Sequence, residues 1–106
     1  MSKVQFRIIK KVSEGTKKIV LSRARHENLN LEELFTKCEA LGIIHCDVCD
    51  MIFASDLAEK AASVSTFEIT GTCPQHMTCL GILGDTAAVE AAVRRITEEL
   101  PKEPEI

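Results

Sequence analysis

Apolar and polar side chains alternate at the start of the chain, a period typical of a strand with one apolar face. Residues 4–11 carry this alternation and predict the first strand. The segment SEGTK, residues 13–17, predicts a turn around Gly15. Residues 17–24, KKIVLSRA, predict a second strand, so the chain is expected to begin with a pair of strands.

The hydrophobic period changes to that of a helix in residues 28–42, NLNLEELFTKCEALG. Asn30 is placed to cap this helix, with Glu33 three residues later, and Gly42 is placed to end it. Its apolar stripe is Leu31, Leu34, Phe35, Cys38 and Leu41. Cys38 is therefore expected to pack in the core.

A second helix is predicted over residues 51–63, MIFASDLAEKAAS, after a short extended segment at residues 42–50, GIIHCDVCD. Asp50 is expected to cap this helix. Its apolar positions are Phe53, Leu57 and Ala61, with Ala54, Ala58 and Ala62 beside them. The small side chains would let the helix approach a sheet or a neighbouring chain closely.

Two strands and a helix complete the chain. Residues 64–70, VSTFEIT, and residues 77–83, MTCLGIL, predict the strands. Asp85 is expected to cap a helix over residues 86–100, which Pro101 stops. The core stripe of this helix is Val89, Val93, Ile96 and Leu100.

From residue 42 onward the predicted order is therefore β-α-β-β-α, behind a strand pair and a short helix. This order predicts an α+β fold, a ferredoxin-like sandwich with helices on one face of a mostly antiparallel sheet. The length favours a single domain, residues 1–106. Residues 1–28 are predicted to hold the N-terminal strands, and residues 101–106 an exposed tail.

Composition disfavours nucleic acid and membrane as partners. The net charge is -3 and the chain has no Trp or Tyr, whereas a nucleic-acid surface needs basic and stacking side chains. No apolar run approaches the roughly 20 residues of a membrane span, and no secretory signal opens the chain. We therefore expect a cytoplasmic protein, in which reducing conditions disfavour disulfides between its five cysteines.

The first candidate site is the C-x-x-C motif of Cys46 and Cys49, typical of a zinc knuckle or a thiol–disulfide redox pair. Asp47 and Asp50 flank these thiols and would oppose thiolate formation. In an extended segment, moreover, the two side chains would point to opposite faces. Buried strand residues are therefore favoured, with a small thiol–disulfide redox module as the alternative function.

The second candidate site is TGTCPQHMTC, residues 70–79, between the last two predicted strands. Cys73 lies beside Pro74 in this segment, and His76 is a candidate ligand or proton donor. Cys79 belongs to the following strand and is expected to pack. Cys73 is either a metal ligand or a surface thiol without a role. No carboxylate pair, phosphate-binding loop or Ser–His–Asp arrangement stands out, so no enzymatic activity is predicted.

Three stretches of the sequence resemble a known family. DLAEKAASV, residues 56–64, and LGILGDTAAVEAAVRRI, residues 80–96, are similar to the bacterial microcompartment (BMC) shell-protein domain. FRIIKKVSEGTKKIVLSRARHE, residues 6–27, is similar to the N-terminal part of the circularly permuted members. The resemblance thus implies a permuted BMC domain with an N-terminal strand extension.

The resemblance also implies a non-enzymatic cyclic homohexamer that tiles with other shell proteins around encapsulated enzymes, in a compartment within the cytoplasm. Lys60 matches the family lysine at the edge where hexamers meet. By analogy with permuted members, residues 4–11 would join a barrel that caps the central pore. The resemblance also implies that the pore lies at the turn formed by Gly71, Thr72, Cys73, Pro74, Gln75 and His76.

This turn departs from the small residues that ordinary members carry at the pore. Cys73 and Pro74 resemble the glycyl-radical type of shell protein, which is associated with a pore iron–sulfur cluster. Such clusters take soft thiolate ligands, typically four. The resemblance implies Cys73 from several chains as metal ligands of one shared 4Fe–4S cluster, for electron transfer or cluster delivery across the shell. A small-molecule-sensing regulatory domain of ferredoxin-like topology is the further alternative.

Overall fold

The computed structural model describes residues 4–25, 30–70 and 77–100. The elements in chain order are β1 (Gln5–Lys10), α1 (Glu14–Arg23), β2 (Ala24–Arg25), α2 (Leu31–Lys37), β3 (Ala40–Asp47), α3 (Val48–Ala61), β4 (Ser65–Ile69), β5 (Met77–Gly84) and α4 (Thr86–Glu99). The β-α-β-β-α order predicted for the later part of the chain is confirmed by β3 to α4.

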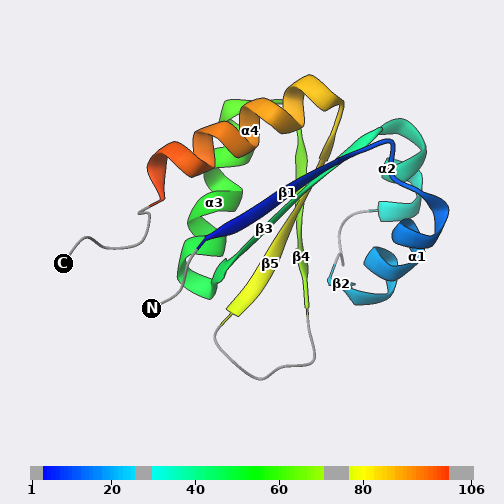
Figure 1. Ribbon diagram of the computed structural model, residues 1–106, viewed down its shortest axis with the longest axis horizontal. Helices are drawn as coiled ribbons and strands as arrows, with labels where there is room; N and C mark the ends of the chain where they lie inside the picture. The colour runs from blue at the N-terminus through cyan, green and yellow to red at the C-terminus, as the bar shows by residue number, and fades with distance from the viewer. Residues whose placement is uncertain (1–3, 26–29, 71–76, 101–106) are drawn as a thin grey trace.

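The strands form one five-stranded sheet in the order β1-β3-β5-β4-β2, and every neighbouring pair is antiparallel (Figure 1). β5 is the central strand and pairs with β3 from Met77 to Gly84. β1 and β2 lie at the two opposite edges. The mixed α+β class predicted from the sequence is therefore confirmed.

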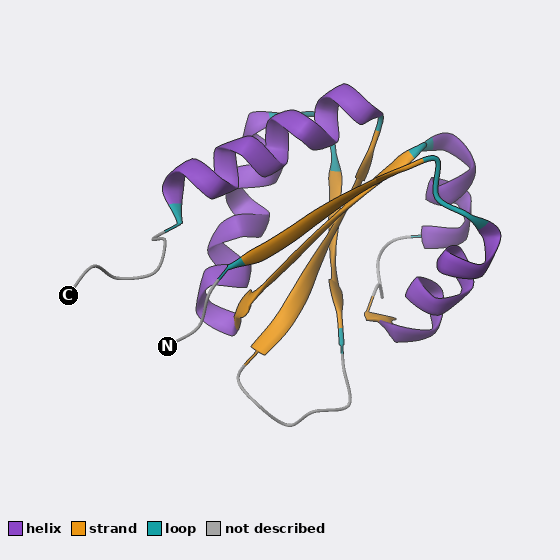
Figure 2. Cartoon of the chain, viewed as in Figure 1, coloured by secondary structure: helices purple, strands orange, loops and turns teal. Residues whose placement is uncertain are grey.

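Helices cover both faces of the sheet, whereas the sequence predicted helices on one face only (Figure 2). α3 and α4 pack on one face, where the buried strand residues include Ile44, Leu80 and Ile82. α1 and α2 pack on the other face, where the buried strand residues are Leu41, Phe67 and Leu83. The prediction is wrong because α2 lies on the face opposite α3 and α4, together with a helix, α1, that forms where the sequence predicts the second strand.

That helix is α1, and it also replaces the turn predicted around Gly15. Ser13 caps it, since the Ser13 Oγ accepts a hydrogen bond from the Thr16 backbone N–H at 3.4 Å. Val20 is its buried residue. The cap and the burial of one side chain override the strand preference of the segment, and strand β2 is limited to Ala24–Arg25.

α2 begins as predicted but ends earlier. Asn30 caps it, because the Asn30 Oδ1 accepts a hydrogen bond from the Glu33 backbone N–H at 3.1 Å. The helix ends at Lys37 instead of Gly42. The residues from Ala40 onward belong to β3, which gains hydrogen-bonded neighbours on both edges.

α3 begins earlier than predicted, since Asp47 and not Asp50 caps it. The Asp47 Oδ1 accepts a hydrogen bond from the Asp50 backbone N–H at 2.9 Å. The buried residues of α3 are Met51, Ala54 and Ala58. Of the predicted stripe, Phe53 is 45% exposed and Ala61 is exposed, whereas Leu57 is half-buried against the core. The core-facing row is the neighbouring one, which includes Ala54 and Ala58.

α4 agrees with its prediction in cap, length and core stripe. The Asp85 Oδ1 accepts a hydrogen bond from the Ala88 backbone N–H at 2.8 Å. The expected core residues are all buried: Val89, Val93, Ile96 and Leu100. Within the three described segments, no helix has the length and apolar character needed to cross a bilayer.

Candidate functional site

The predicted pore turn connects β4 to β5. Its residues, Gly71, Thr72, Cys73, Pro74, Gln75 and His76, lie outside the described residues. The strand ends on either side are described. Ile69 is the register partner of Cys79, so the connection joins two adjacent antiparallel strands at one end of the sheet. The sequence prediction that this segment lies between two paired strands is confirmed.

Polar contacts hold both ends of this connection. The Thr70 backbone N–H and Oγ1 both donate to the Arg23 carbonyl oxygen, at 2.8 and 2.9 Å. Thr78, which is 8% exposed, donates from its Oγ1 to the Glu68 Oε2 at 2.9 Å. The end of β4 is therefore held to the last residue of α1, and the start of β5 is held to β4.

The C-x-x-C cysteines are separated by the boundary between β3 and α3. Cys46 is 1% exposed on β3, and Cys49 is exposed in the first turn of α3. Burial, followed by the nearby Asp50 and Asp47 carboxylates, raises the pKa of Cys46 to about 12. No group of three or more His, Cys, Asp or Glu residues suited to a metal occurs in the described segments. The motif is thus unsuited to thiolate chemistry at neutral pH.

Two further thiols are half-buried, in agreement with the packing role that the sequence predicted for them. Burial raises the pKa of Cys79, and burial together with the Asp85 carboxylate raises the pKa of Cys38. All four described cysteines are free thiols. Three of them are therefore held in the protonated form, while Cys49 is exposed.

Lys60, the predicted edge residue, is exposed near the end of α3. Its Nζ lies 2.9 Å from the Asp56 Oδ2, one helical turn earlier. The side chain of Lys60 is 75% exposed, so this ion pair leaves the ammonium accessible to solvent. The other predicted site residues, 71–76, lie outside the described part of the chain, so the position of Lys60 relative to them stays a prediction.

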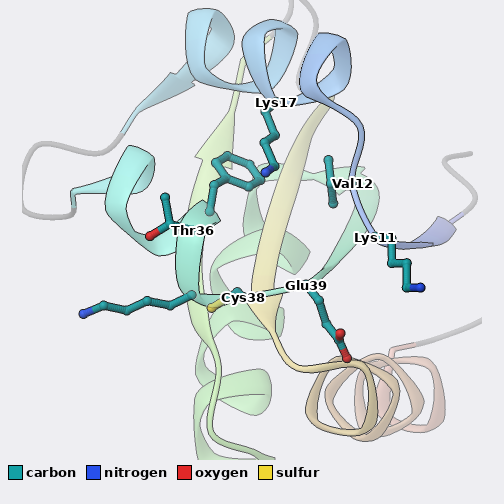
Figure 3. Close-up of a pocket in the computed structure, with 8 residues that line it drawn as sticks. Lys11, Val12, Lys17, Thr36, Cys38 and Glu39 are labelled. Atoms are coloured by element: carbon teal, nitrogen blue, oxygen red, sulfur yellow. The ribbon is translucent and has the colours of Figure 1, made fainter.

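A pocket of about 270 Å³ lies between α2 and the connection from β1 to α1, and the sequence did not indicate it (Figure 3). Lys17 extends into it, whereas Lys11 and Glu39 extend toward its rim. The Lys17 Nζ pairs with Glu14 at 3.2 Å, and Glu39 accepts a hydrogen bond from Thr86. The Lys17 ammonium, which extends into the pocket, is therefore already paired with a carboxylate of the same chain. This pairing disfavours the pocket as a binding site for an anionic ligand.

A larger pocket, of about 350 Å³, lies on the open half of the sheet face that α1 and α2 leave uncovered. Its lining residues are Gln5, Phe6, Arg7, Ile43, His45 and Cys79. Sequence reasoning missed it because the residues come from three strands, and only the strand register brings them together.

The later part of the chain matches a known protein family. The family model described as BMC domain matches residues 40–106, from the first residue of β3 onward. The chain belongs to the BMC-domain family. β1, α1, β2 and α2 precede the matched part of this BMC domain.

Solved structures of microcompartment shell proteins resemble this BMC-domain chain over nearly its whole length. The ligand-free GrpU shell protein from Pectobacterium wasabiae is 33% identical, covers 88% of this chain and 99% of its own, and has a TM-score of 0.68. The ligand-free GrpU shell protein from Clostridiales bacterium 1_7_47FAA is also 33% identical, with coverages of 88% and 87% and a TM-score of 0.62. The BMC-domain chain is therefore a microcompartment shell protein.

A third structure shows the fold alone. The fused permuted hexameric shell protein MSM0275 from the RMM microcompartment is 22% identical, covers 97% of this BMC-domain chain and 48% of its own, and has a TM-score of 0.67. No curated protein sequence matches the chain.

Proposed function

We propose that this shell protein is a circularly permuted subunit of a cyclic homohexamer, with the connection between β4 and β5 at the central pore. Cys73 from several chains would hold an iron–sulfur cluster there. The observation that carries the proposal is the single Cys-Pro pair, Cys73 and Pro74, in a connection whose two strand ends are held by hydrogen bonds. The role is structural and electron-transferring, with no catalytic step.

Burial makes three of the four described thiols poor candidates for the ligand, which leaves Cys73 and the exposed Cys49 as candidates. Cys38, Cys46 and Cys79 have raised pKa values, whereas a cluster ligand must be a thiolate. The described segments of one chain hold no group of three metal-ligating residues. The described segments alone could not hold a cluster that needs about four thiolates, which supports a cluster shared between several copies.

The cluster, once bound, would supply one-electron transfer across the shell or be delivered to enclosed enzymes. The chain's own residues would hold it. Pro74 restricts the backbone beside the ligand, and the contacts of Thr70 and Thr78 hold the ends of the turn. Lys60 would contact neighbouring hexamers and other shell proteins, in a shell within the cytoplasm. β1 pairs with β3 over Gln5–Lys10 as an edge strand of the main sheet, so a barrel on the pore would need these residues to leave that sheet.

Anaerobic reconstitution with iron and sulfide tests this proposal, with Cys49→Ser as the matched control. We expect a brown wild-type hexamer by native mass spectrometry, a colourless Cys73→Ser hexamer, and a Cys49→Ser hexamer that keeps its colour. Cys49 is the appropriate control because it is the exposed thiol among the described residues. A colourless wild-type hexamer, or a coloured Cys73→Ser hexamer, would overturn the cluster site and leave the hexamer intact. A monomeric wild type in native mass spectrometry would overturn the proposed hexamer and its central pore.

A further inference from the structure

The pocket on the open half of the sheet is built by the strand register. Gln5 pairs with His45, and His45 pairs with Cys79, so these three residues form one row across β1, β3 and β5. Arg7 pairs with Ile43 in the next row on the same face. The pocket is therefore a two-row patch on a regular sheet, which positions its side chains more rigidly than a loop would.

The polar groups of this pocket are predominantly hydrogen-bond donors. Arg7 brings a guanidinium with five N–H groups, Gln5 an amide NH₂ and His45 at least one ring N–H. One Arg7 N–H donates to the Phe6 carbonyl oxygen at 2.8 Å, which leaves most of the guanidinium for a ligand. Burial raises the pKa of Cys79, so its sulfur carries a proton and is also a weak donor.

The charge of the pocket is opposite to that of the whole protein. Among the described residues that line it there is no carboxylate, and Arg7 supplies a permanent positive charge. The chain as a whole carries a net charge of -3. A cationic, donor-rich pocket favours small anions over cations, because the Arg7 guanidinium attracts negative charge and the donors can pair with it.

The apolar lining narrows the class of anion. Ile43 is half-buried in the middle of the patch and supplies its apolar surface, whereas Phe6 pairs with Ile44 and directs its side chain to the opposite face. Pockets that bind small molecules combine such apolar surface with a few convergent polar groups, and 350 Å³ is at the small end of their range. A planar carboxylate fits the guanidinium in a two-point contact, and a short alkyl chain fits the Ile43 side.

We propose that this pocket binds a small carboxylate with a short alkyl chain, held by Arg7, Gln5 and His45 and packed against Ile43. The site lies beside the β4–β5 connection, since Cys79 pairs with the last residue of β4, Ile69. Its existence does not depend on a cluster at Cys73. The inference concerns recognition of the anion and includes no chemical step.

A methyl-labelled titration of the assembled protein with butanoate tests the inference. The Ile43 δ1-methyl signal should shift saturably with butanoate, whereas that of Ile82, buried on the opposite face, should not. Arg7→Gln should weaken binding at least about tenfold, because a hydrogen bond to a charged group contributes more than a neutral one. Arg25→Gln is the matched control, as Arg25 lies on β2 at the opposite edge of the sheet.

Each other outcome overturns the inference. Inorganic phosphate that binds as tightly as butanoate would show a general anion surface instead of a carboxylate site. Butylammonium that binds equally well would show that the alkyl chain alone is recognised. Equal weakening by Arg7→Gln and Arg25→Gln would show that only net charge matters, and a titration without saturation would show that no site exists.

Discussion

Cys46 and Cys49 are three positions apart in the sequence but lie on different elements, and one side chain is buried while the other is exposed. Cys46 is 1% exposed at the end of β3, and Cys49 is exposed in the first turn of α3. The boundary between them is the cap formed by Asp47, whose carboxylate accepts the Asp50 N–H. That same carboxylate contributes to the raised pKa of Cys46. The C-x-x-C spacing, which is typical of redox pairs, therefore spans the boundary between a strand and a helix here, with one cysteine in each.

The two thiols should differ in reactivity. In the folded protein, iodoacetamide should modify Cys49 readily and Cys46 at least about a hundredfold more slowly, because the reagent needs an accessible thiolate. Peptide mass spectrometry of briefly treated protein measures both rates, and denatured protein should show similar rates for the two. Equally rapid labelling of Cys46 in the folded state would contradict the buried position described for it.

The buried Cys46 thiol should make stability depend on pH at the alkaline end. Its pKa rises from 9.0 to about 12 on folding, so between these values the unfolded chain loses its proton and the folded chain keeps it. The stabilisation is fully present below pH 9.0 and is lost as the pH rises toward about 12.

Urea unfolding across this range, for the wild type and for Cys46→Ala, measures the effect. We expect a shallower alkaline loss of the free energy of unfolding in the variant. A residual slope should remain, since Cys38 and Cys79 also have raised pKa values. Parallel curves for the two proteins would refute the assignment to Cys46.

The later half of the fold was predictable because its signals are local. The cap of α4 at Asp85 and its stripe of Val89, Val93 and Ile96 lie within one helix, and each is visible in the sequence. The first half was predicted only in part, because β1 and the Asn30 cap of α2 agree with the sequence pattern whereas α1 does not. α1 buries only Val20, so its pattern lacks the period that marks an amphipathic helix, and its cap at Ser13 precedes the segment for which the pattern predicts a strand.

The candidate sites were predictable to different degrees for the same reason. That Cys73 lies between two paired strands follows from local patterns, but what several copies of Cys73 form together depends on other chains. The pocket proposed to bind a carboxylate could not be predicted from the sequence, because Arg7, Ile43 and Cys79 become neighbours only through the pairing of β1, β3 and β5. Long-range strand register is not encoded in any short stretch of sequence.

Gly81 is required by an aromatic ring on the neighbouring strand. Phe67 is its register partner, and a Cβ at Gly81 would lie 2.6 Å from the Phe67 Cε2. Phe67 is 5% exposed, so its ring has little room to move. Gly81→Ala should therefore destabilise the protein by about 1–3 kcal/mol.

Gly15→Ala is the matched control, because a Cβ at Gly15 meets nothing within 4 Å. It lies in α1 and should leave stability unchanged or raise it by up to about 1 kcal/mol. Urea unfolding of both variants gives the comparison. The double variant Gly81→Ala with Phe67→Leu should recover part of the loss, and equal effects of the two alanines would contradict the close contact.

Lys60 should matter for assembly between hexamers and hardly at all for folding. Its ion pair with Asp56 is exposed, with side chains 75% and 57% exposed, and such pairs contribute at most about 1 kcal/mol. Lys60→Ala should thus keep the wild-type melting behaviour while losing extended layers seen by electron microscopy. Lys37→Ala is the matched control, since Lys37 pairs with Glu33 at the same helical spacing and similar exposure but on α2. Layers that persist in Lys60→Ala, or that vanish equally in Lys37→Ala, would remove Lys60 from the proposed edge.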